Sequence, residues 1–428
     1  MNTTPRPTAP TPTTAPARPV APEEITAWVA GHRADMLGEL SRYVDTETPS
    51  DDKACLDAAL PGLEQWLEQV LGTPSARHRA DGGAYGDTLV LDWPGARTGE
   101  GAPSGEDAAP ILLLCHYDTV WSRGTVAERP FAVDGDRATG PGVFDMKAGL
   151  VQVLWAVRAL DAFGLPRPPL RLVLNGDEEL GSPGSRPVIE AAAAGVPAAL
   201  VFEASADGAI KTARKGVGLF QVTATGVEAH AGLDPAKGVS AVDEIARAVL
   251  SLHALSDADA GTTVNVGIVT GGTRANVSAG QAVAHLDVRV SDDAEADRID
   301  RALAALRPHD ARARLETSGG WNRPVMSRTP GNARLFSLAR DHAAALGLTL
   351  RECAVGGASD GNFVAALGVP VLDGFGAVGA GAHARDEYIS LDGMTERTAL
   401  AAAVLSALAD PAVAAGTVTD AAAPGAAG

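Results

Sequence analysis

The sequence predicts an α/β protein with a mixed, mainly parallel sheet flanked by helices, into which a smaller α+β domain is inserted. Three observations predict this fold class. Short apolar runs alternate with helical segments through most of the chain, which is typical of strands buried on both faces of a parallel sheet. One central stretch changes to the strict alternation of an antiparallel sheet with one wetted side. The length of 428 residues exceeds what one hydrophobic core usually serves, so we expect two domains.

The N-terminal part is expected to contain an irregular leader followed by amphipathic helices. Residues 1–21 are rich in Thr, Pro and Ala and lack the apolar core of a secretory signal, so we predict a disordered leader. From Pro22 to about residue 70, apolar residues recur at helical spacing, as at Ile25 and Val29. These helices are expected to cover one side of the sheet.

Three short apolar runs predict the strands at the centre of the parallel sheet. They cover residues 111–115, 170–174 and 199–202. A strong helical pattern over residues 147–160 separates the first two runs. Because parallel strands need a crossover connection, this order predicts a doubly wound arrangement.

The inserted domain is predicted to span residues 214–324. Between residues 284 and 290 every second residue is apolar, whereas His285, Asp287 and Arg289 share the opposite, wetted face. The predicted elements are strands at 218–225, 262–269 and 282–290 and helices at 241–255 and 294–306.

The α/β pattern resumes after residue 325. Helices are predicted at 332–346 and 360–367, and a strand at 369–372. The first domain therefore consists of two parts, 22–213 and 325–411. The Ala-, Gly- and Pro-rich residues 412–428 are expected to form a flexible tail.

Charge and cysteine content exclude several classes of function. With 35 basic and 53 acidic residues the formal charge is −18, which repels nucleic acid and anionic lipid surfaces. No apolar run approaches the roughly 20 residues that span a bilayer. The three cysteines, Cys55, Cys115 and Cys353, are scattered and odd in number, so we expect structural thiols and a cytoplasmic location.

Candidate metal ligands follow the predicted strands. His116 and Asp118 follow the first apolar run, Glu178 and Glu179 the second, and Glu203 the third. Because the carboxyl ends of parallel strands gather at one sheet edge, these groups can converge.

Two further candidates, Asp145 and His383, lie in Gly-rich loops with the sequences GPGVFDMKAG and GAVGAGAHAR. Glycine lets such loops turn sharply and approach an ion closely.

Imidazoles and carboxylates without thiolates suit zinc, or cobalt or manganese as substitutes, in a hydrolytic site. If one carboxylate bridges two ions about 3.5–4 Å apart, the other ligands divide as one His and one carboxylate per ion. A spare carboxylate can then take a proton from the attacking water and deliver it to the leaving amine. Of the adjacent pair Glu178 and Glu179, we expect one to be a ligand and the other to be this base.

Several stretches jointly resemble the co-catalytic zinc hydrolases that include glutamate carboxypeptidase, aminoacylase, acetylornithine deacetylase and succinyl-diaminopimelate desuccinylase. The matching stretches run from about residue 110 to 390 and are CHYDTV, GPGVFDMKAG, NGDEELGS, VFEA, GVEAHAGLDPAKGVSA, HLDVRV, GGASDGNF and GAHARDEY. The resemblance implies a catalytic domain formed by 22–213 and 325–411, and a dimerisation and lid domain formed by 214–324. It also implies a homodimer with two zinc ions per subunit.

The resemblance also implies a role for each metal-site residue. His116 and Glu203 would bind one ion and Glu179 and His383 the other, with Asp145 as the bridge. Glu178 would be the general base. Asp118 would orient His116, a role that carboxylates often have beside a ligating imidazole; a simple turn or helix cap is the alternative. The family often has a cis peptide after the bridging Asp, here between Asp145 and Met146.

Three residues of the inserted domain are implied to contact substrate. His230 would reach the active site of the partner subunit and stabilise the oxyanion. Arg289 would pair with the substrate carboxylate, for which a guanidinium fork is suited; an ordinary strand salt bridge is the alternative. Asn276 would help to hold substrate, although Ala279 stands where the family usually has proline.

We therefore predict a zinc-dependent, glutamate-carboxypeptidase-like hydrolase that cleaves an amide bond beside a free carboxylate. The GPG loop and Glu203 favour this class over the aminopeptidases of the family. The alternatives are an N-acyl amino acid deacylase, of the acetylornithine deacetylase or succinyl-diaminopimelate desuccinylase type, and a relative that binds ligands or forms dimers without catalysis. Lys147 is expected to cap or pack, and Arg214 with Lys215 to mark a hinge or form a solvated basic pair.

Overall fold

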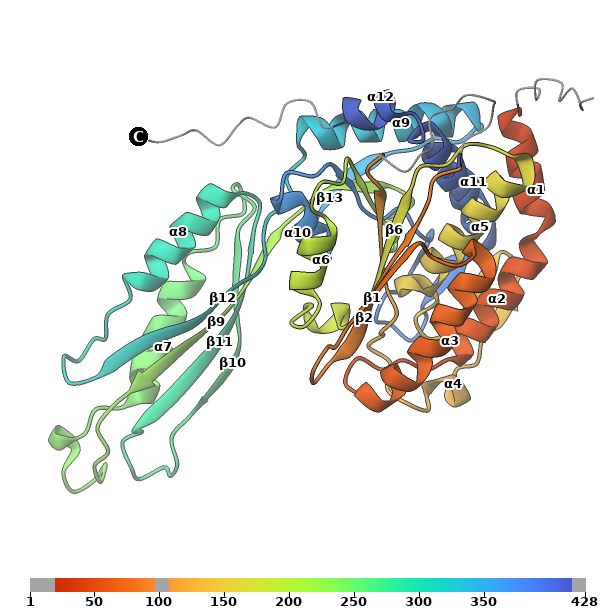
Figure 1. Ribbon diagram of the computed structural model, residues 1–428. Coiled ribbons are helices and arrows are strands. Elements are labelled where there is room, and N and C mark those ends of the chain that lie inside the picture. Colours follow the sequence, from red (N-terminus) through yellow and green to blue (C-terminus); the bar gives the residue numbers. More distant parts are fainter. Residues whose placement is uncertain (1–19, 97–107, 418–428) are drawn as a thin grey trace, which may run out of the picture.

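The computed structural model describes residues 20–96 and 108–417, and its main domain is built on a six-stranded mixed sheet (Figure 1). Strands β6, β3, β7 and β14 are parallel, whereas β2 is antiparallel to both β1 and β6. The predicted mixed, mainly parallel sheet is confirmed. In spatial order the strands are β1 (Ala76–Ala80), β2 (Gly86–Trp93), β6 (Leu170–Gly176), β3 (Ile111–His116), β7 (Ala199–Val201) and β14 (Val371–Leu372).

Both faces of this sheet are buried, because alternate residues of β3 belong to two different cores. Ile111, Leu113 and Cys115 join the larger core, and Leu112 and Leu114 the smaller one. Side chains of α6 (Arg186–Ala192) and α10 (Gly361–Ala366) complete the smaller core. The larger core is covered by α1 (Pro22–Gly31), α2 (Arg33–Asp45), α3 (Lys53–Leu71), α5 (Ala148–Phe163), α9 (Pro330–Ala345) and α11 (Leu391–Ala407).

Some boundaries differ from the sequence prediction. The strand predicted at 369–372 is shortened to β14, because Pro370 supplies no N–H for the ladder. Residues 412–416, which were predicted to belong to the flexible tail, are helical, because α12 (Pro411–Gly416) starts with a capping bond from Ala412 N to Asp410 Oδ1 and buries Ala414. Most of the predicted leader and tail, residues 1–19 and 418–428, lies outside the described residues.

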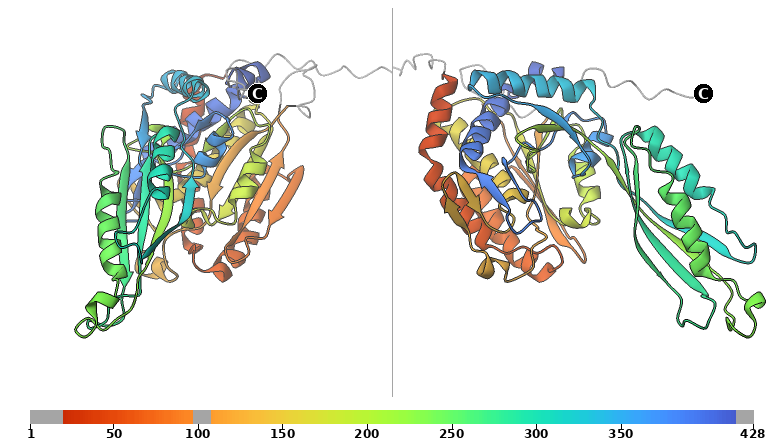
Figure 2. Two further views of the ribbon diagram at one scale, coloured as in Figure 1. Left: turned by 90° about the vertical axis from the view of Figure 1, so that its left-hand side faces the viewer. Right: turned by 180° about the vertical axis from the view of Figure 1, so that it is seen from behind.

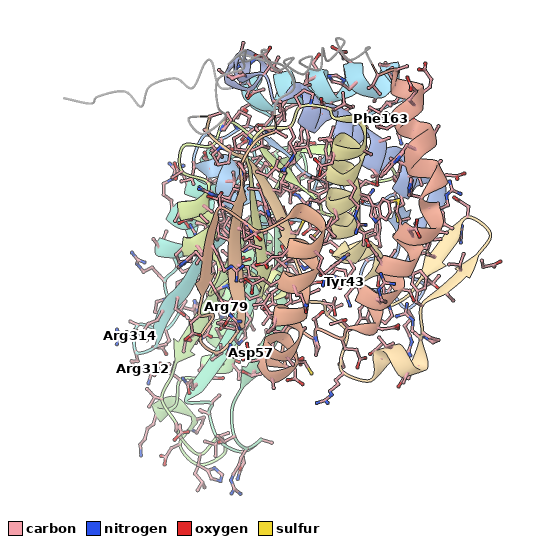
Figure 3. All side chains as sticks on the ribbon, turned by 45° about the vertical axis from the view of Figure 1, so that its right-hand side comes forward. Tyr43, Asp57, Arg79, Phe163, Arg312 and Arg314 are labelled. Carbon is pink, nitrogen blue, oxygen red and sulfur yellow. The ribbon has the colours of Figure 1, made fainter. Side chains whose placement is uncertain are left out.

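The inserted domain is a separate lobe with its own sheet and core (Figures 1 and 2). The antiparallel sheet has the order β10 (Thr263–Gly271), β11 (Gln281–Val290), β9 (Gly216–Thr225) and β12 (Arg314–Arg323). On β11 the even-numbered residues from 282 to 290 are buried and the odd-numbered ones more exposed, as the alternation predicted. Helices α7 (Ala241–His253) and α8 (Asp293–Ala304) cover one face. In Figure 3, Arg312 and Arg314 lie on this lobe, remote from Tyr43 of the main domain.

The chain crosses between the lobes at two adjacent points. Arg214 and Met326 form an antiparallel bridge, with N···O distances of 2.9 and 3.1 Å. The Arg214 side chain is buried and donates to Asp373 at 2.5 Å. The interpretation of Arg214 as part of a solvated pair is therefore wrong, because its guanidinium anchors the crossing to the main domain.

Two small sheets support the loops around the main sheet. One pairs β8 (Ile210–Arg214) with β13 (Glu352–Val355) in parallel. The other has the order β15 (Gly379–Ala380), β16 (Tyr388–Ser390), β5 (Arg137–Thr139) and β4 (Ala132–Asp134). Cys55, Cys115 and Cys353 are free thiols. Among the described residues, no helix has the length and apolar character to cross a bilayer.

Candidate metal centre

The candidate ligands converge at the carboxyl edge of the parallel strands. His116 is the last residue of β3, and Glu203 lies two residues after β7. Glu178 and Glu179 lie in the short helix η3 (Glu178–Leu180) that follows β6. Asp145 lies in the turn η2 (Val143–Lys147) that precedes α5, and His383 follows β15. Five separate segments thus contribute side chains to one volume.

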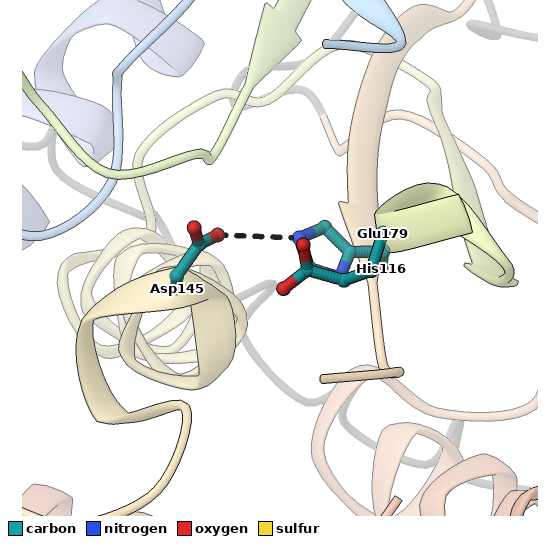
Figure 4. A group of neighbouring side chains, drawn as sticks. All are labelled: His116, Asp145 and Glu179. Atoms are coloured by element: carbon teal, nitrogen blue, oxygen red, sulfur yellow. Dashed lines mark ion pairs between the residues drawn. The ribbon is translucent and has the colours of Figure 1, made fainter. Parts of the chain in front are cut away.

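Asp145 lies between the two imidazoles. Its Oδ1 is 3.4 Å from His116 Nε2, and its Oδ2 is 3.4 Å from His383 Nε2. Figure 4 shows the carboxylate of Asp145 facing the His116 ring, with Glu179 beside that ring. Each oxygen of one carboxylate is therefore directed at a different histidine, which is the orientation that a bridging ligand needs.

Each histidine also faces a second carboxylate. Glu203 Oε1 is 3.3 Å from His116 Nε2, and Glu179 Oε2 is 3.0 Å from His383 Nε2. The ligand atoms of His116, Asp145 and Glu179 lie within 4.8 Å of one another, as do those of His116, Glu178 and Glu203. Two His–carboxylate pairs thus flank Asp145, and the assignment of ligands to two ions stays a prediction.

The donor set fits a divalent metal pair. Two buried atoms that face the cluster, His116 Nε2 and Glu179 Oε1, make no hydrogen bond within the described protein, although buried polar atoms nearly always have a partner. Imidazole nitrogens and carboxylate oxygens are ligands that zinc, cobalt and manganese accept. Cations would also neutralise the crowded carboxylates of Asp145, Glu178, Glu179 and Glu203.

The protonation equilibria reflect this crowding. Burial, and then the neighbouring Glu203, raise the pKa of Glu178 well above its usual value. Burial likewise raises the pKa of Glu179 to about 7. Hydrogen bonds to Asp145 and Glu179 raise the pKa of His383 to about 10. In the metal-free protein the site therefore retains protons that bound cations would displace.

Asp118 holds two parts of the centre together. Its carboxylate lies 3.4 Å from His116 Nδ1, and its backbone oxygen lies 3.0 Å from the same atom. The same carboxylate accepts the backbone N–H groups of Glu178 and Glu179, each at 3.2 Å. Asp118 can therefore fix the ring of one ligand and the peptide that carries another ligand.

The turn around Asp145 depends on glycine. Gly142 has φ of +71°, and a Cβ there would lie 2.6 Å from the Thr119 side chain. The peptide between Asp145 and Met146 is cis, as the resemblance implied. Lys147 donates from Nζ to the carbonyls of Tyr43, Val44 and Thr46, at 3.1, 3.4 and 2.8 Å, and thus caps the end of α2 as expected.

Comparison with known proteins agrees with this geometry. Residues 112–407 match the family described as peptidase family M20/M25/M40. Over 377 residues the chain is 30% identical to carboxypeptidase G2 of Pseudomonas sp. (strain RS-16), covering 86% of this chain and 88% of that one. The chain belongs to peptidase family M20/M25/M40. As a member of this family it is a hydrolase of amide bonds.

Other M20 relatives extend the comparison. Acetylornithine deacetylase of Myxococcus xanthus is 32% identical over 220 residues, which cover 48% of this chain and 56% of that one. The crystal structure of the M20 metallo-carboxypeptidase Sso-CP2 from Sulfolobus solfataricus superposes with a TM-score of 0.66 at 16% identity, covering 87% of this chain and 98% of that one. At this identity the superposition shows a shared fold.

The M20 centre contains two residues that the sequence analysis did not single out. Arg323, the last residue of β12, donates to Glu178 Oε1 at 3.2 Å, to Ser182 Oγ at 2.9 Å and to Gly181 O at 2.5 Å. It also forms an ion pair of 3.0 Å with Asp360 Oδ1. Asp360 lies in the quoted stretch GGASDGNF, but Arg323 lies in WNRP, which carries no motif.

The predicted substrate residues of the inserted domain lie in two places. His230 and Asn276 are neighbours, since Ala231 N donates to Asn276 O at 3.0 Å and His230 forms a bridge with Val277. Their loops follow β9 and β10 at the outer end of the lobe (Figure 1). His230 is exposed, and no described contact joins either residue to the metal centre.

Arg289 lies near the other end of β11. The eight steps along the strand from position 281 to position 289 span roughly 26 Å at about 3.3 Å each. Arg289 pairs with Asp287 at 2.7 and 2.8 Å and approaches Gly356 O of the main domain at 3.5 Å. Within one subunit, Arg289 is therefore far from His230 and Asn276. The roles of all three residues in substrate binding stay predictions.

Proposed function

We propose that this M20 protein is a zinc-dependent hydrolase that cleaves an amide bond beside a free carboxylate, as a glutamate carboxypeptidase does. The observation that carries the proposal is the position of Asp145, whose two oxygens face two histidines that each have a carboxylate of their own. Such a set suits two ions that share one bridging ligand.

The proposed ligands are His116 and Glu203 for one ion, Glu179 and His383 for the other, and Asp145 for both. Zinc is the expected metal, with cobalt or manganese as substitutes. When bound, two such ions would polarise the substrate carbonyl and lower the pKa of a bound water toward neutrality. The residues of the chain then supply orientation and proton transfer.

Glu178 is the proposed general base. Its carboxylate lies beside His116 and Glu203, but it forms its ion pair with the guanidinium of Arg323, whereas Glu203 and Glu179 pair with histidines. Burial raises the pKa of Glu178, so the carboxylate can accept the proton of an attacking water at the scissile carbon. The resulting carboxyl group can then protonate the leaving amine nitrogen.

We further propose that the substrate carboxylate displaces Asp287 and pairs with Arg289. Arg289 is about one third exposed and already lies beside Gly356 of the main domain. Its fork geometry fits a carboxylate.

His230 and Asn276 are proposed to act on the active site of a partner subunit, because they lie at the outer end of their own lobe. A homodimer through the inserted domain would bring them there. The edge strand β10 supports this arrangement, since its unpaired side and the exposed Ile268 and Val269 suit pairing with a second copy.

An N-acyl amino acid deacylase is the second candidate. Acetylornithine deacetylases are among the similar proteins, but the one from Myxococcus xanthus matches only 48% of this chain, against 86% for carboxypeptidase G2. Rates of hydrolysis of a dipeptide with C-terminal glutamate and of N-acetylornithine would separate the two activities. We expect the glutamate dipeptide to be hydrolysed faster.

The decisive experiment compares the wild type with Glu178→Gln. We expect zinc- or cobalt-dependent hydrolysis in the wild type, loss with a chelator, and a fall in kcat of at least about a hundredfold in the variant, with metal still bound. Glu190→Gln, at a partly exposed carboxylate that pairs with Arg186 outside the cluster, is the matched control. Activity that survives both the chelator and Glu178→Gln would refute the mechanism, and metal binding without hydrolysis of any amide would favour a non-catalytic relative.

A further inference from the structure

A single buried carboxylate contacts the loop that carries Asp145. Glu387 accepts backbone N–H bonds from Gly142 at 3.0 Å, Phe144 at 2.8 Å and Asp145 at 3.1 Å. Its fourth partner is the indole N–H of Trp121, at 2.9 Å. The side chain is fully buried.

All four partners of Glu387 are donors. A carboxylate is an acceptor only, whereas a glutamine or a protonated carboxyl would turn a donor toward other donors. No Lys, Arg or His lies within ion-pair distance of Glu387 among residues 20–96 and 108–417. The direct partners of this buried charge are therefore oriented N–H dipoles, three of which belong to the Asp145 loop, and Lys147 adds a longer-range Coulombic attraction.

The position of Glu387 in the fold connects two loops that carry metal ligands. Glu387 directly precedes β16, which pairs with β5 through Tyr388 and Thr139. The Asp145 loop follows β5, and His383 lies four residues before Glu387. Gly381 allows the close approach, since a Cβ there would lie 3.0 Å from both N and Cα of Glu387. The same side chain thus belongs to the His383 loop and binds the Asp145 loop.

We propose that Glu387 is a positioning residue that fixes the Asp145 loop against the His383 loop, so that the two Asp145 oxygens face His116 and His383. This inference rests on the proposed two-metal site and adds a residue that contacts neither ion. Repulsion among the neighbouring carboxylates opposes the approach of Asp145 to Glu179 and Glu203. Hydrogen bonds that hold the Asp145 backbone in advance reduce the ordering that metal binding must otherwise drive.

The test is a titration of the metal-free protein with Co²⁺, followed by visible absorption, in the wild type and in Glu387→Gln. We expect the dissociation constant of the variant to rise about 10- to 100-fold, as is usual when a group that orients metal ligands is removed. The absorption bands of bound Co²⁺ are expected to change, because the bridging carboxylate is no longer fixed. Far-ultraviolet circular dichroism identifies the folded fraction to which the constants refer.

Two further variants make the result specific. Trp121→Phe removes only one of the four donors, so it should fold and weaken Co²⁺ binding by about 2- to 10-fold. Glu128→Gln is the control, because Glu128 also contacts the His383 loop through Arg385, but at the surface, where an ion pair contributes little. Its dissociation constant should equal that of the wild type.

The outcomes separate this inference from the proposed function. Unchanged Co²⁺ affinity and spectrum in folded Glu387→Gln and Trp121→Phe would overturn the positioning role, even if both variants were less stable. Should Glu387→Gln fail to fold, an unchanged affinity in Trp121→Phe alone would overturn it. A wild-type protein that binds no Co²⁺ would instead refute the two-metal function.

Discussion

Replacing Arg323 by methionine tests whether its guanidinium is the cation on which the proposed base depends. Methionine keeps the length and the apolar stem of arginine but removes every donor. Arg323 lies in contact with two carboxylates, Glu178 at 3.2 Å and Asp360 at 3.0 Å, and is 3% exposed. Breaking a buried ion pair by removing one partner costs about 3–5 kcal/mol, because the other charge is left uncompensated. We expect a loss of this order in the free energy of unfolding.

The double variant Arg323→Met/Asp360→Asn isolates the contribution of the pair. Asn removes the charge that Arg323→Met leaves uncompensated, so the loss in the double variant should be smaller than the sum of the two single losses, with a coupling of roughly 0.5–3 kcal/mol. Urea unfolding of the metal-free proteins, followed by tryptophan fluorescence, measures these free energies. Arg328→Met, at an exposed pair with Glu352, is the control and should cost less than about 1 kcal/mol.

The same variant has a kinetic consequence. The charge of Arg323 lowers the pKa of Glu178, against the stronger effect of burial. Without that charge the pKa of Glu178 rises further, so the acid limb of the pH profile of kcat/KM should move to higher pH. Wild-type stability together with an unmoved acid limb in Arg323→Met would refute the reasoning.

Three further predictions concern the metal ligands, their support and the dimer. Hydrogen bonds to carboxylates raise the pKa of His383 to about 10, so Co²⁺ must displace the His383 proton at neutral pH, and the apparent Co²⁺ affinity should rise with pH by roughly tenfold per unit for each proton released. Calorimetry in buffers of different ionisation enthalpy counts the released protons. Binding that does not depend on pH would contradict the expectation. Asp118→Asn should lower kcat/KM about 10- to 100-fold. It should also lower the unfolding midpoint, because the buried amide NH2 cannot accept a backbone N–H bond. Full activity of the folded variant in steady-state kinetics would exclude the orienting role. Ile268→Asp on the edge strand β10 should convert a dimer into a monomer in sedimentation experiments. Leu367→Asp, at a similarly exposed apolar residue of the main domain, should not. A dimer that survives Ile268→Asp would place the interface elsewhere.

Elements with strong periodicity could be predicted from the sequence, and elements held by partners could not. The runs that became β3, β6 and β7 are apolar enough to indicate burial on both faces, and β11 alternates without a break. In contrast, β1 has the sequence ARHRA and is almost wholly exposed, and β12, RLETSGGWNR, has little apolar pattern. Both are edge strands, so pairing with a neighbour defines them more than their own side chains do.

For the site, the sequence determined the candidate donors, because strand ends and motif residues specify which imidazoles and carboxylates are present. His116, Asp145, Glu179, Glu203 and His383 were all predicted, and the structure brings them within one cluster. Asp118 was also predicted as a supporting group, but only the tertiary structure revealed the others. Arg323 reaches Glu178 from a strand of the inserted domain, and Glu387 reaches the Asp145 loop across 242 positions of sequence. Such contacts leave no local sequence pattern. A buried polar group needs a hydrogen-bond partner, and any donor or charge that the fold brings near can be that partner.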